Sequence, residues 1–238
     1  MKKTFIVANW KSNKTESEAK DWLSEISIFF KDQALNLSNK EIIVCPSFVH
    51  LPAMKTFIEE QKLPIKLGAQ DVSPFPEGAY TGQVAARQVV EFATYSIVGH
   101  SERRKYFHQT NKDVINEVKI LLENKLIPIL CISDMIQMDY YLAHGKIILD
   151  NAEDIIFVYE PPGAISGGGA YRPESPENAN QNAAKISNKI GKPVITIYGG
   201  SVNPDNAIFL FSQKNIYGGL VGQASLDPKK FYAIIQNA

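Results

Sequence analysis

The chain has 238 residues, of which 45% are hydrophobic, enough to bury the core of one large domain. Its 25 lysines and arginines balance its 25 aspartates and glutamates, so it lacks the strongly basic surface typical of proteins that bind nucleic acids or acidic membranes. Any binding site for an anion must therefore be local.

The two cysteines, Cys45 and Cys131, lie in separate apolar runs, without a CxxC motif or a Cys/His cluster at the spacing of metal ligands. We expect both to be buried thiols of a reducing compartment, and we expect no metal, disulfide or cofactor. The N-terminus begins like a signal peptide, but Asn9 and Lys11 interrupt its apolar run, and no run approaches the ~18 residues of a membrane span. The sequence thus predicts a soluble, cytoplasmic protein.

Eight short apolar runs recur along the chain and predict eight β-strands. Consecutive residues of these runs are apolar, which is the pattern of parallel strands buried on both faces. The runs span residues 4–10, 41–46, 65–70, 95–100, 127–133, 155–160, 193–200 and 218–224.

Stretches with the period of a helix separate several of these runs, at residues 16–31, 82–95, 111–125 and 175–191. In the last stretch Ser175 is at the N-cap position, Pro176 at the first helical position and Gly191 at the C-terminal end. Eight strand–helix units in ~250 residues predict a (β/α)8 barrel that forms one domain. An open doubly wound sheet is the alternative, but it usually has fewer strands and a GxGxxG motif after the first one, which is missing here.

Polar residues and glycine turns follow several predicted strands, at the end of a barrel where catalytic groups lie. Taken singly, each has a structural explanation as a surface lysine, a hydrogen-bonded histidine or a turn. Together they would gather a carboxylate, an imidazole and an ammonium group beside turns whose backbone N–H groups can bind phosphate. This combination predicts proton abstraction next to a carbonyl group. The residues are Asn9, Lys11, His100, Glu160, Gly199, Gly200, Ser201, Gly222 and Gln223.

Several of these residues lie in segments that resemble the triosephosphate isomerase family, in the same order over essentially the whole chain. The loop at 68–82, GAQDVSPFPEGAYTG, is also similar to a loop of that family. The other segments are ANWK (8–11), VGHSERR (98–104), YEP (159–161), YGGSV (198–202) and LVGQASL (220–226).

The resemblance implies an aldose–ketose isomerase, an intramolecular oxidoreductase of glycolysis and gluconeogenesis that interconverts D-glyceraldehyde 3-phosphate and dihydroxyacetone phosphate through an enediol or enediolate. Glu160 matches the base, and His100 matches the group that polarises the carbonyl oxygen as a neutral imidazole, its pKa lowered at the start of a short helix. Lys11 matches the cation that stabilises negative charge, Asn9 a polar partner of the oxyanion, and Glu102 a member of the polar network near the lysine.

The resemblance also implies a phosphate site built from backbone groups, covered by a lid that protects the enediolate from water. The lid departs from the family pattern, because it begins Pro161-Pro162-Gly163 and contains three consecutive glycines, Gly167 to Gly169. Glycines raise the entropy lost on closing, so we expect a weaker closed state and looser phosphate binding. The phosphate contacts are expected at Ser166, Ser201, Gly222 and Gln223.

Three further features follow from the resemblance. The loop at 68–82 would reach a second copy of the chain through Thr81 and form a homodimer. Ser133 and Asp134 replace the usual glycine and glutamate after Cys131, and the segment from there to Glu160 is shorter than usual, which predicts a trimmed fifth helical region. Gln223 stands where the family commonly has a second glycine.

Two other readings remain open at this point. One is a different phosphate-binding barrel enzyme, such as an epimerase or an aldolase with Lys11 as Schiff-base nucleophile, although such a lysine should sit in an apolar pocket. The other is a catalytically weak barrel that binds phosphorylated metabolites.

Overall fold

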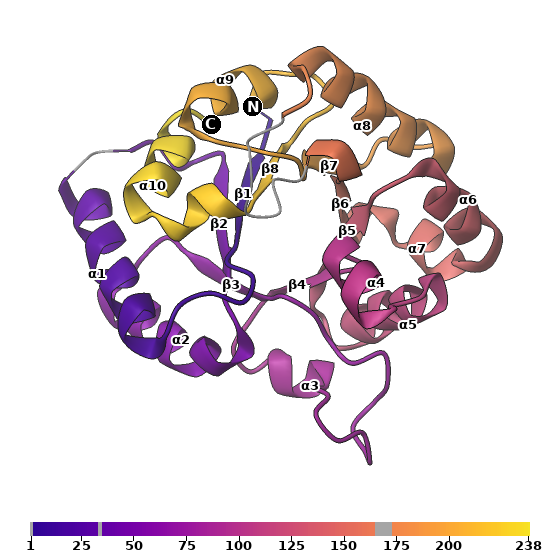
Figure 1. The fold of residues 1–238 in the computed structure, drawn as a ribbon, viewed down its shortest axis with the longest axis horizontal. Helices are drawn as coiled ribbons and strands as arrows, with labels where there is room; N and C mark the ends of the chain where they lie inside the picture. Colours follow the sequence, from indigo (N-terminus) through magenta and orange to yellow (C-terminus); the bar gives the residue numbers. More distant parts are fainter. Residues whose placement is uncertain (1, 33–34, 165–172) are drawn as a thin grey trace.

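Eight parallel strands form a closed barrel in the computed structural model, which describes residues 2–32, 35–164 and 173–238 (Figure 1). Strand β1 pairs with both β2 and β8, which closes the sheet on itself. The expected (β/α)8 fold and all eight expected strands are confirmed. The strands are β1 (Thr4–Asn9), β2 (Lys40–Cys45), β3 (Lys66–Ala69), β4 (Tyr95–Val98), β5 (Ile127–Ile132), β6 (Ile156–Tyr159), β7 (Ile195–Tyr198) and β8 (Gly218–Val221).

Helices follow the strands and surround the barrel (Figure 1). The α-helices are α1 (Glu16–Asp32), α2 (Leu51–Gln61), α3 (Ala86–Val89), α4 (Ser101–Phe107), α5 (Asn111–Glu123), α6 (Met135–His144), α7 (Lys146–Asp150), α8 (Pro176–Ile190), α9 (Pro204–Phe211) and α10 (Pro228–Gln236). Short 3-10 helices are η1 (Phe48–His50), η2 (Ala152–Asp154), η3 (Pro162–Ala164) and η4 (Gln223–Leu226).

The apolar runs of the strands serve two separate cores. In β1, Phe5 and Val7 belong to a cluster inside the barrel, whereas Ile6 and Ala8 belong to the larger cluster between strands and helices. Successive side chains of a strand point to opposite faces, so both faces need apolar residues. This explains why consecutive residues in the middle of these strands are apolar.

Helix α8 ends where its sequence predicts. The Ser175 side chain accepts a hydrogen bond from the N–H of Asn178, Pro176 is the first helical residue, and Gly191 adopts the left-handed conformation with φ of 84°. A glycine takes this conformation without a steric penalty. The cap residues therefore determine the boundaries of this helix.

The helix expected over residues 82–95 is wrong in its length, because only Ala86–Val89 is helical. Before it, Val84 accepts a hydrogen bond from the N–H of Ser73, and after it the N–H of Thr94 donates to the carbonyl oxygen of Leu67 in β3. Both flanks of the segment are thus already hydrogen-bonded to other parts of the fold. Only one turn of helix fits between them.

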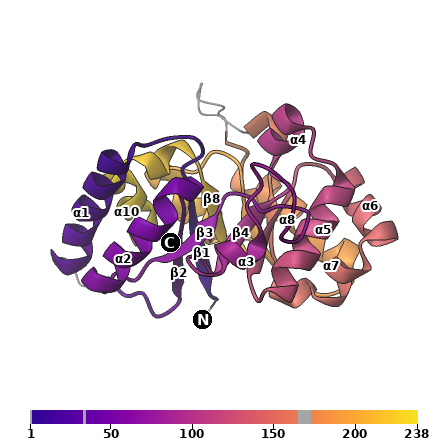
Figure 2. The same ribbon diagram turned by 90° about the horizontal axis from the view of Figure 1, so that it is seen from below.

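The C-terminal ends of the strands lie together at the upper end of the barrel in Figure 2, where α4 also lies, while the N-terminus lies at the opposite end. In the part of the chain that the structure describes, no helix is long and apolar enough to cross a membrane. The same described part contains no cluster of three or more His, Cys, Asp or Glu side chains suited to hold a metal ion.

Candidate active site

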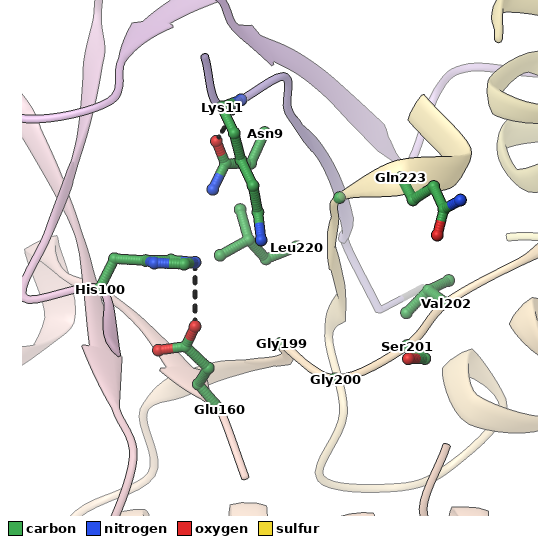
Figure 3. Close-up of a pocket in the computed structure, with 11 residues that line it drawn as sticks. Asn9, Lys11, His100, Glu160, Gly199, Gly200, Ser201, Val202, Leu220 and Gln223 are labelled. Atoms are coloured by element: carbon green, nitrogen blue, oxygen red, sulfur yellow. Dashed lines mark hydrogen bonds and ion pairs between the residues drawn. The ribbon is translucent and has the colours of Figure 1, made fainter. Parts of the chain in front are cut away.

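A pocket at the C-terminal ends of the strands brings together most of the side chains singled out in the sequence (Figure 3). Strands β1, β4, β6, β7 and β8 each contribute residues to it through their last positions or the loops that follow. The pocket is lined by Asn9, Lys11, His100, Glu160, Gly199, Gly200, Ser201, Val202, Leu220, Gly222 and Gln223.

Glu160 is the first residue after β6 and is 0% exposed to solvent. Its backbone N–H donates to Ile132 at the end of β5, so the residue is held in the sheet up to the mouth of the barrel. Its carboxylate oxygen Oε1 lies 2.9 Å from Nε2 of His100 and accepts a hydrogen bond from Oγ of Ser101 at 2.9 Å. The other oxygen, Oε2, accepts from the N–H of Ser101 at 3.0 Å and from Oγ of Ser133 at 3.4 Å.

These contacts decide the protonation state of Glu160. Burial alone would raise the pKa of a carboxyl group, because it disfavours the charged form. The interactions with His100 and with the backbone and hydroxyl of Ser101 outweigh burial and hold the pKa of Glu160 below its usual value. In this arrangement Glu160 is an ionised carboxylate, but its donors also make it a weak base.

His100 is placed by a sharp turn between β4 and α4. Gly99 has a φ of 70°, and a Cβ atom there would lie 3.0 Å from Nη2 of Arg104, so the turn requires glycine. His100 is the N-cap of α4, and its Nδ1 accepts a hydrogen bond from the N–H of Glu102 at 3.2 Å. Because Nδ1 is an acceptor, the geometry assigns the ring proton to Nε2, which donates to Glu160.

Lys11 adopts the left-handed backbone conformation with φ of 53°, which costs a residue with a side chain about 1 kcal/mol. Neighbouring polar groups hold it there: its N–H donates to Oδ1 of Asn9 at 3.1 Å, and its carbonyl accepts from Nε2 of Gln70 at 2.8 Å. Its Nζ forms an ion pair with Oε1 of Glu102 at 2.6 Å. The loop thus aims one positive charge into the pocket.

The glycine turn after β8 lies beside this lysine. A Cβ atom on Gly222 would be 3.6 Å from Cε of Lys11, so the aliphatic part of the lysine passes over the turn. Gly222 is the N-cap of η4 and Gln223 is its first residue, and among the hydrogen bonds of the described residues none uses their backbone N–H groups as donors. The side chain of Gln223 projects away from Lys11 and Glu160 (Figure 3).

The hydrogen-bond donors of Ser201, unlike those of the glycine turn, are already in use. Its N–H and its hydroxyl both donate to the carbonyl oxygen of Ala164, at 2.9 Å and 2.7 Å. These donors reach a phosphate only after the contact with Ala164 is broken. The other expected phosphate contact, Ser166, lies outside the described residues, as do Gly167 to Gly169.

Three contributors to the site were missed in the sequence: Ser101, Ser133 and Gln70. Ser101 directly follows His100, and Ser133 and Gln70 directly follow β5 and β3. The rule that polar residues at strand ends point to the site could have found the last two. Ser101 had no such signal, because its contact with Glu160 depends on the turn into α4.

Comparisons with known proteins agree over the whole chain. A family model of triosephosphate isomerase matches residues 4–238. A triosephosphate isomerase from Thermus thermophilus is 37% identical over 256 aligned positions, which cover 100% of both chains. Proteins of the same name from Alkaliphilus metalliredigens and Mycoplasmopsis pulmonis are each 35% identical, over 99% of this chain and 99% and 98% of theirs.

Proposed function

Because the chain belongs to the triosephosphate isomerase family, we propose that Glu160, His100 and Lys11 are the groups through which it acts. The enzyme interconverts D-glyceraldehyde 3-phosphate and dihydroxyacetone phosphate, an aldose–ketose isomerisation of glycolysis. The observation that carries the assignment is a carboxylate with 0% exposure, 2.9 Å from an imidazole Nε2, at the mouth of the barrel.

In the proposed mechanism Glu160 removes a proton from the carbon next to the carbonyl group and returns it to the adjacent carbon. The two carbons are bonded neighbours, so one carboxylate serves both steps. The electron pair of the broken C–H bond forms a C=C bond while the π pair of the carbonyl moves onto its oxygen, which gives an enediol or enediolate. When the proton returns to the other carbon, the hydroxyl on the first carbon loses its proton to the former carbonyl oxygen and becomes the new carbonyl. General bases of this kind contribute about 100- to 10,000-fold to rates.

His100 couples the base to the substrate. In the free enzyme its Nε2 proton is donated to Glu160. When a substrate carbonyl oxygen takes this proton as its hydrogen-bond partner, Glu160 loses one donor while it stays away from water. Its pKa then rises, so the carboxylate becomes a stronger base at the time when it is needed.

Lys11 and Asn9 complete the electrostatic part of the proposal. The ammonium group of Lys11 is balanced by Glu102 in the free enzyme and stabilises a phosphorylated substrate and the developing enediolate. The amide of Asn9, which is 5% exposed, fixes the lysine backbone and lines the same pocket.

The proposed phosphate site uses backbone donors. The N–H groups of Gly222 and Gln223 lie at the N-terminus of a 3-10 helix next to Lys11. They can donate hydrogen bonds to an anion there without adding charge. Ser201 joins them once it leaves Ala164. Ser166 is retained as a phosphate contact on its sequence alone.

The test is a coupled assay of glyceraldehyde 3-phosphate conversion with the variant Glu160→Gln. We expect kcat to fall by about 100- to 10,000-fold with little change in thermal stability. The matched control is Glu153→Gln, whose side chain is largely exposed and paired with Lys192 at the surface, and which should keep wild-type activity. Equal activity of the Glu160 variant and the wild type would refute the assignment of the base.

An aldolase mechanism is not favoured by the surroundings of Lys11. A Schiff-base lysine needs an apolar pocket, whereas Nζ of Lys11 lies in an ion pair with Glu102 and its side chain is 28% exposed. Borohydride reduction in the presence of substrate should therefore trap no adduct on Lys11.

We also propose a homodimer through the loop at 68–82, which projects from the barrel near α3 (Figure 1). Phe75 and Tyr80 stack there with ring centroids 4.6 Å apart, yet both remain about 40% exposed, and Thr81 beside them is exposed. A stiff apolar tip of this kind suits insertion into a second copy. A Thr81→Arg variant should show a lower mass in light scattering and lower activity, whereas an unchanged mass and activity would refute the proposal.

The proposed location is the cytoplasm. Cys45 and Cys131 are both free and buried inside the barrel, and burial raises the pKa of each thiol. Unpaired thiols of this kind are typical of a reducing compartment.

A further inference from the structure

We propose that Ser133 is a positioning residue for the base: its hydroxyl holds the carboxylate of Glu160 in the orientation that faces Ser101 and so weakens the base until substrate binds. The proposal rests on the proposed role of Glu160. It assigns a task to the first residue after β5, the strand that lies between β4 and β6 in the barrel.

The donors around Glu160 come from two loops, those that follow β4 and β5. Three of the four contacts come from the turn between β4 and α4, namely Nε2 of His100 and the N–H and Oγ of Ser101. The fourth is Oγ of Ser133, 3.4 Å from Oε2. Because Oε2 also accepts from Ser101, that oxygen lies between donors of two neighbouring loops. The carboxylate cannot rotate without losing at least one of them.

The backbone of Ser133 is itself fixed by the start of α6. Its N–H donates to Oε1 of Gln137 at 2.9 Å, and the N–H of Gln137 donates to Oδ1 of the N-cap Asp134 at 2.9 Å. Gln137 is 9% exposed, so the hydrogen bond that its side chain accepts from Ser133 is largely shielded from water. The position of the Ser133 hydroxyl near Glu160 is therefore set by the helix N-terminus and not by a free loop.

The expected effect follows from the chemistry of the contact. A hydroxyl that donates to a carboxylate stabilises the charged form, so its removal raises the pKa of the acid. The contact is the longest of the four, so its effect should be the smallest of them. We expect a rise of about half a pH unit, and an effect on kcat/KM at neutral pH of no more than about threefold.

The pH profile of kcat/KM contains the titration of Glu160 together with that of the substrate phosphate, at about pH 6, which is the same for every variant. Among the described residues, His100 from the turn after β4 and Cys131 of β5 interact electrostatically with Glu160, and the charged Lys11 from the loop after β1 lines the same pocket. Burial, followed by the charge of Glu160, raises the pKa of the Cys131 thiol, so it stays neutral in the acid range. His100 is present in both the wild type and the variants.

The experiment compares Ser133→Ala and Ser133→Thr with the wild type by the pH dependence of kcat/KM, with melting temperatures as a check on folding. The acidic limb should move upward by about half a pH unit in the alanine variant and return toward the wild-type value in the threonine variant, which keeps the hydroxyl. Carbon-13 NMR titration of Glu160 in the free enzyme measures the same shift without turnover, and Ser133→Gly replaces the alanine variant if that one does not fold.

The outcomes separate the two proposals. An acidic limb and a Glu160 titration that are unchanged in Ser133→Ala, while Glu160→Gln is inactive, would overturn the role of Ser133 and leave the base in place. An active Glu160→Gln variant would overturn both. A loss of activity in Ser133→Ala that threonine does not restore, without a shift in either titration, would show that Ser133 is merely structural.

Discussion

The two ends of the barrel each hold a shielded carboxylate, and the pair shows what distinguishes a catalytic group from a structural one. Glu41 lies in β2 at the end opposite to Glu160, and its side chain is 10% exposed. It pairs with Nζ of Lys3 at 2.6 Å and of Lys66 at 2.5 Å, and Tyr95 donates to it from its hydroxyl at 3.1 Å. Glu160 instead accepts hydrogen bonds from an imidazole and from serine groups.

In both carboxyl groups burial favours the neutral form, and in both the partners outweigh burial and lower the pKa. A lowered pKa therefore does not by itself identify the active site. The difference lies in the partners. The ammonium groups of Lys3 and Lys66 keep Glu41 ionised whether or not substrate is bound, whereas a substrate can take over a donor of Glu160 and so change its strength as a base.

In a third carboxyl group the partners do not outweigh burial, and its pKa is raised. Glu117 of α5 is 1% exposed, its Oε1 accepts a hydrogen bond from Gln109, and its Oε2 has no partner among the described residues. Burial, and next the nearby charge of Asp71, raise the pKa of Glu117. Arg103 pairs with Asp71 at 2.6 Å and leaves Glu117 as a neutral acid.

The largest effect should come from Lys11, the ammonium group at the catalytic end of the barrel. Lys11→Met removes the positive charge that the loop after β1 aims into the pocket, and we expect kcat/KM to fall at least about 100-fold, because the charge acts on the substrate and on the enediolate. Steady-state kinetics and a thermal melt measure the change in activity and in stability.

Lys66→Met is the matched control at the other end, where Lys66 pairs with Glu41 and is 53% exposed. It should keep wild-type kcat/KM and lose only a few tenths of a kcal/mol of unfolding free energy. Similar losses of activity in both variants would remove the distinction between the two ends.

The next effect concerns Glu117. Its pKa is raised in the folded state, so the folded protein keeps a proton that the unfolded chain releases. Its contribution to stability is complete below the ordinary carboxyl pKa and is lost as pH rises above it. Urea unfolding measures the free energy of unfolding at about pH 5 and about pH 8. Between these values it should fall by on the order of 1–3 kcal/mol in the wild type and by much less in Glu117→Gln. An equal pH dependence of both would show that Glu117 is ionised.

A smaller effect is expected for Glu41→Gln. The pKa of Glu41 is lowered, so its contribution is present above the ordinary carboxyl pKa and disappears as pH falls below it. The two lysines that pair with Glu41 are about half exposed and can be solvated in the variant. The free energy of unfolding at neutral pH should therefore fall by about 1 kcal/mol. Chemical unfolding at neutral pH and at about pH 3 measures this difference, and kcat/KM should not change. A loss that persists at acid pH would mean that the side chain acts through packing.

The barrel could be predicted from the sequence because its signals are local. The apolar pattern of the strands, the caps of α8 and the polar residues at strand ends each follow from neighbours in the chain. Those signals predict that Asn9, Lys11, His100 and Glu160 share one pocket, and all four line it. The predicted helix over 82–95 is too long because hydrogen bonds to Ser73 before α3 and to Leu67 after it determine where the helix begins and ends, and neither residue belongs to the predicted helix.

What could not be predicted is which hydrogen bonds are already in use. The sequence placed Ser201 beside the phosphate, but its N–H and hydroxyl both bind Ala164. It also placed Glu160 at the mouth, but not its contacts with Ser101 and Ser133. Such contacts depend on the relative position of two loops to within about an ångström, which no local pattern encodes.

The central claim is that the carboxylate at the catalytic end moves the substrate proton and that the one at the opposite end does not. Exchange of a carbon-bound hydrogen of dihydroxyacetone phosphate with deuterium from D2O, followed by proton NMR, tests this directly. The wild type and Glu41→Gln should exchange at the same rate, and Glu160→Gln should exchange at least about 100-fold more slowly. Exchange by Glu160→Gln at the rate of Glu41→Gln would contradict the claim.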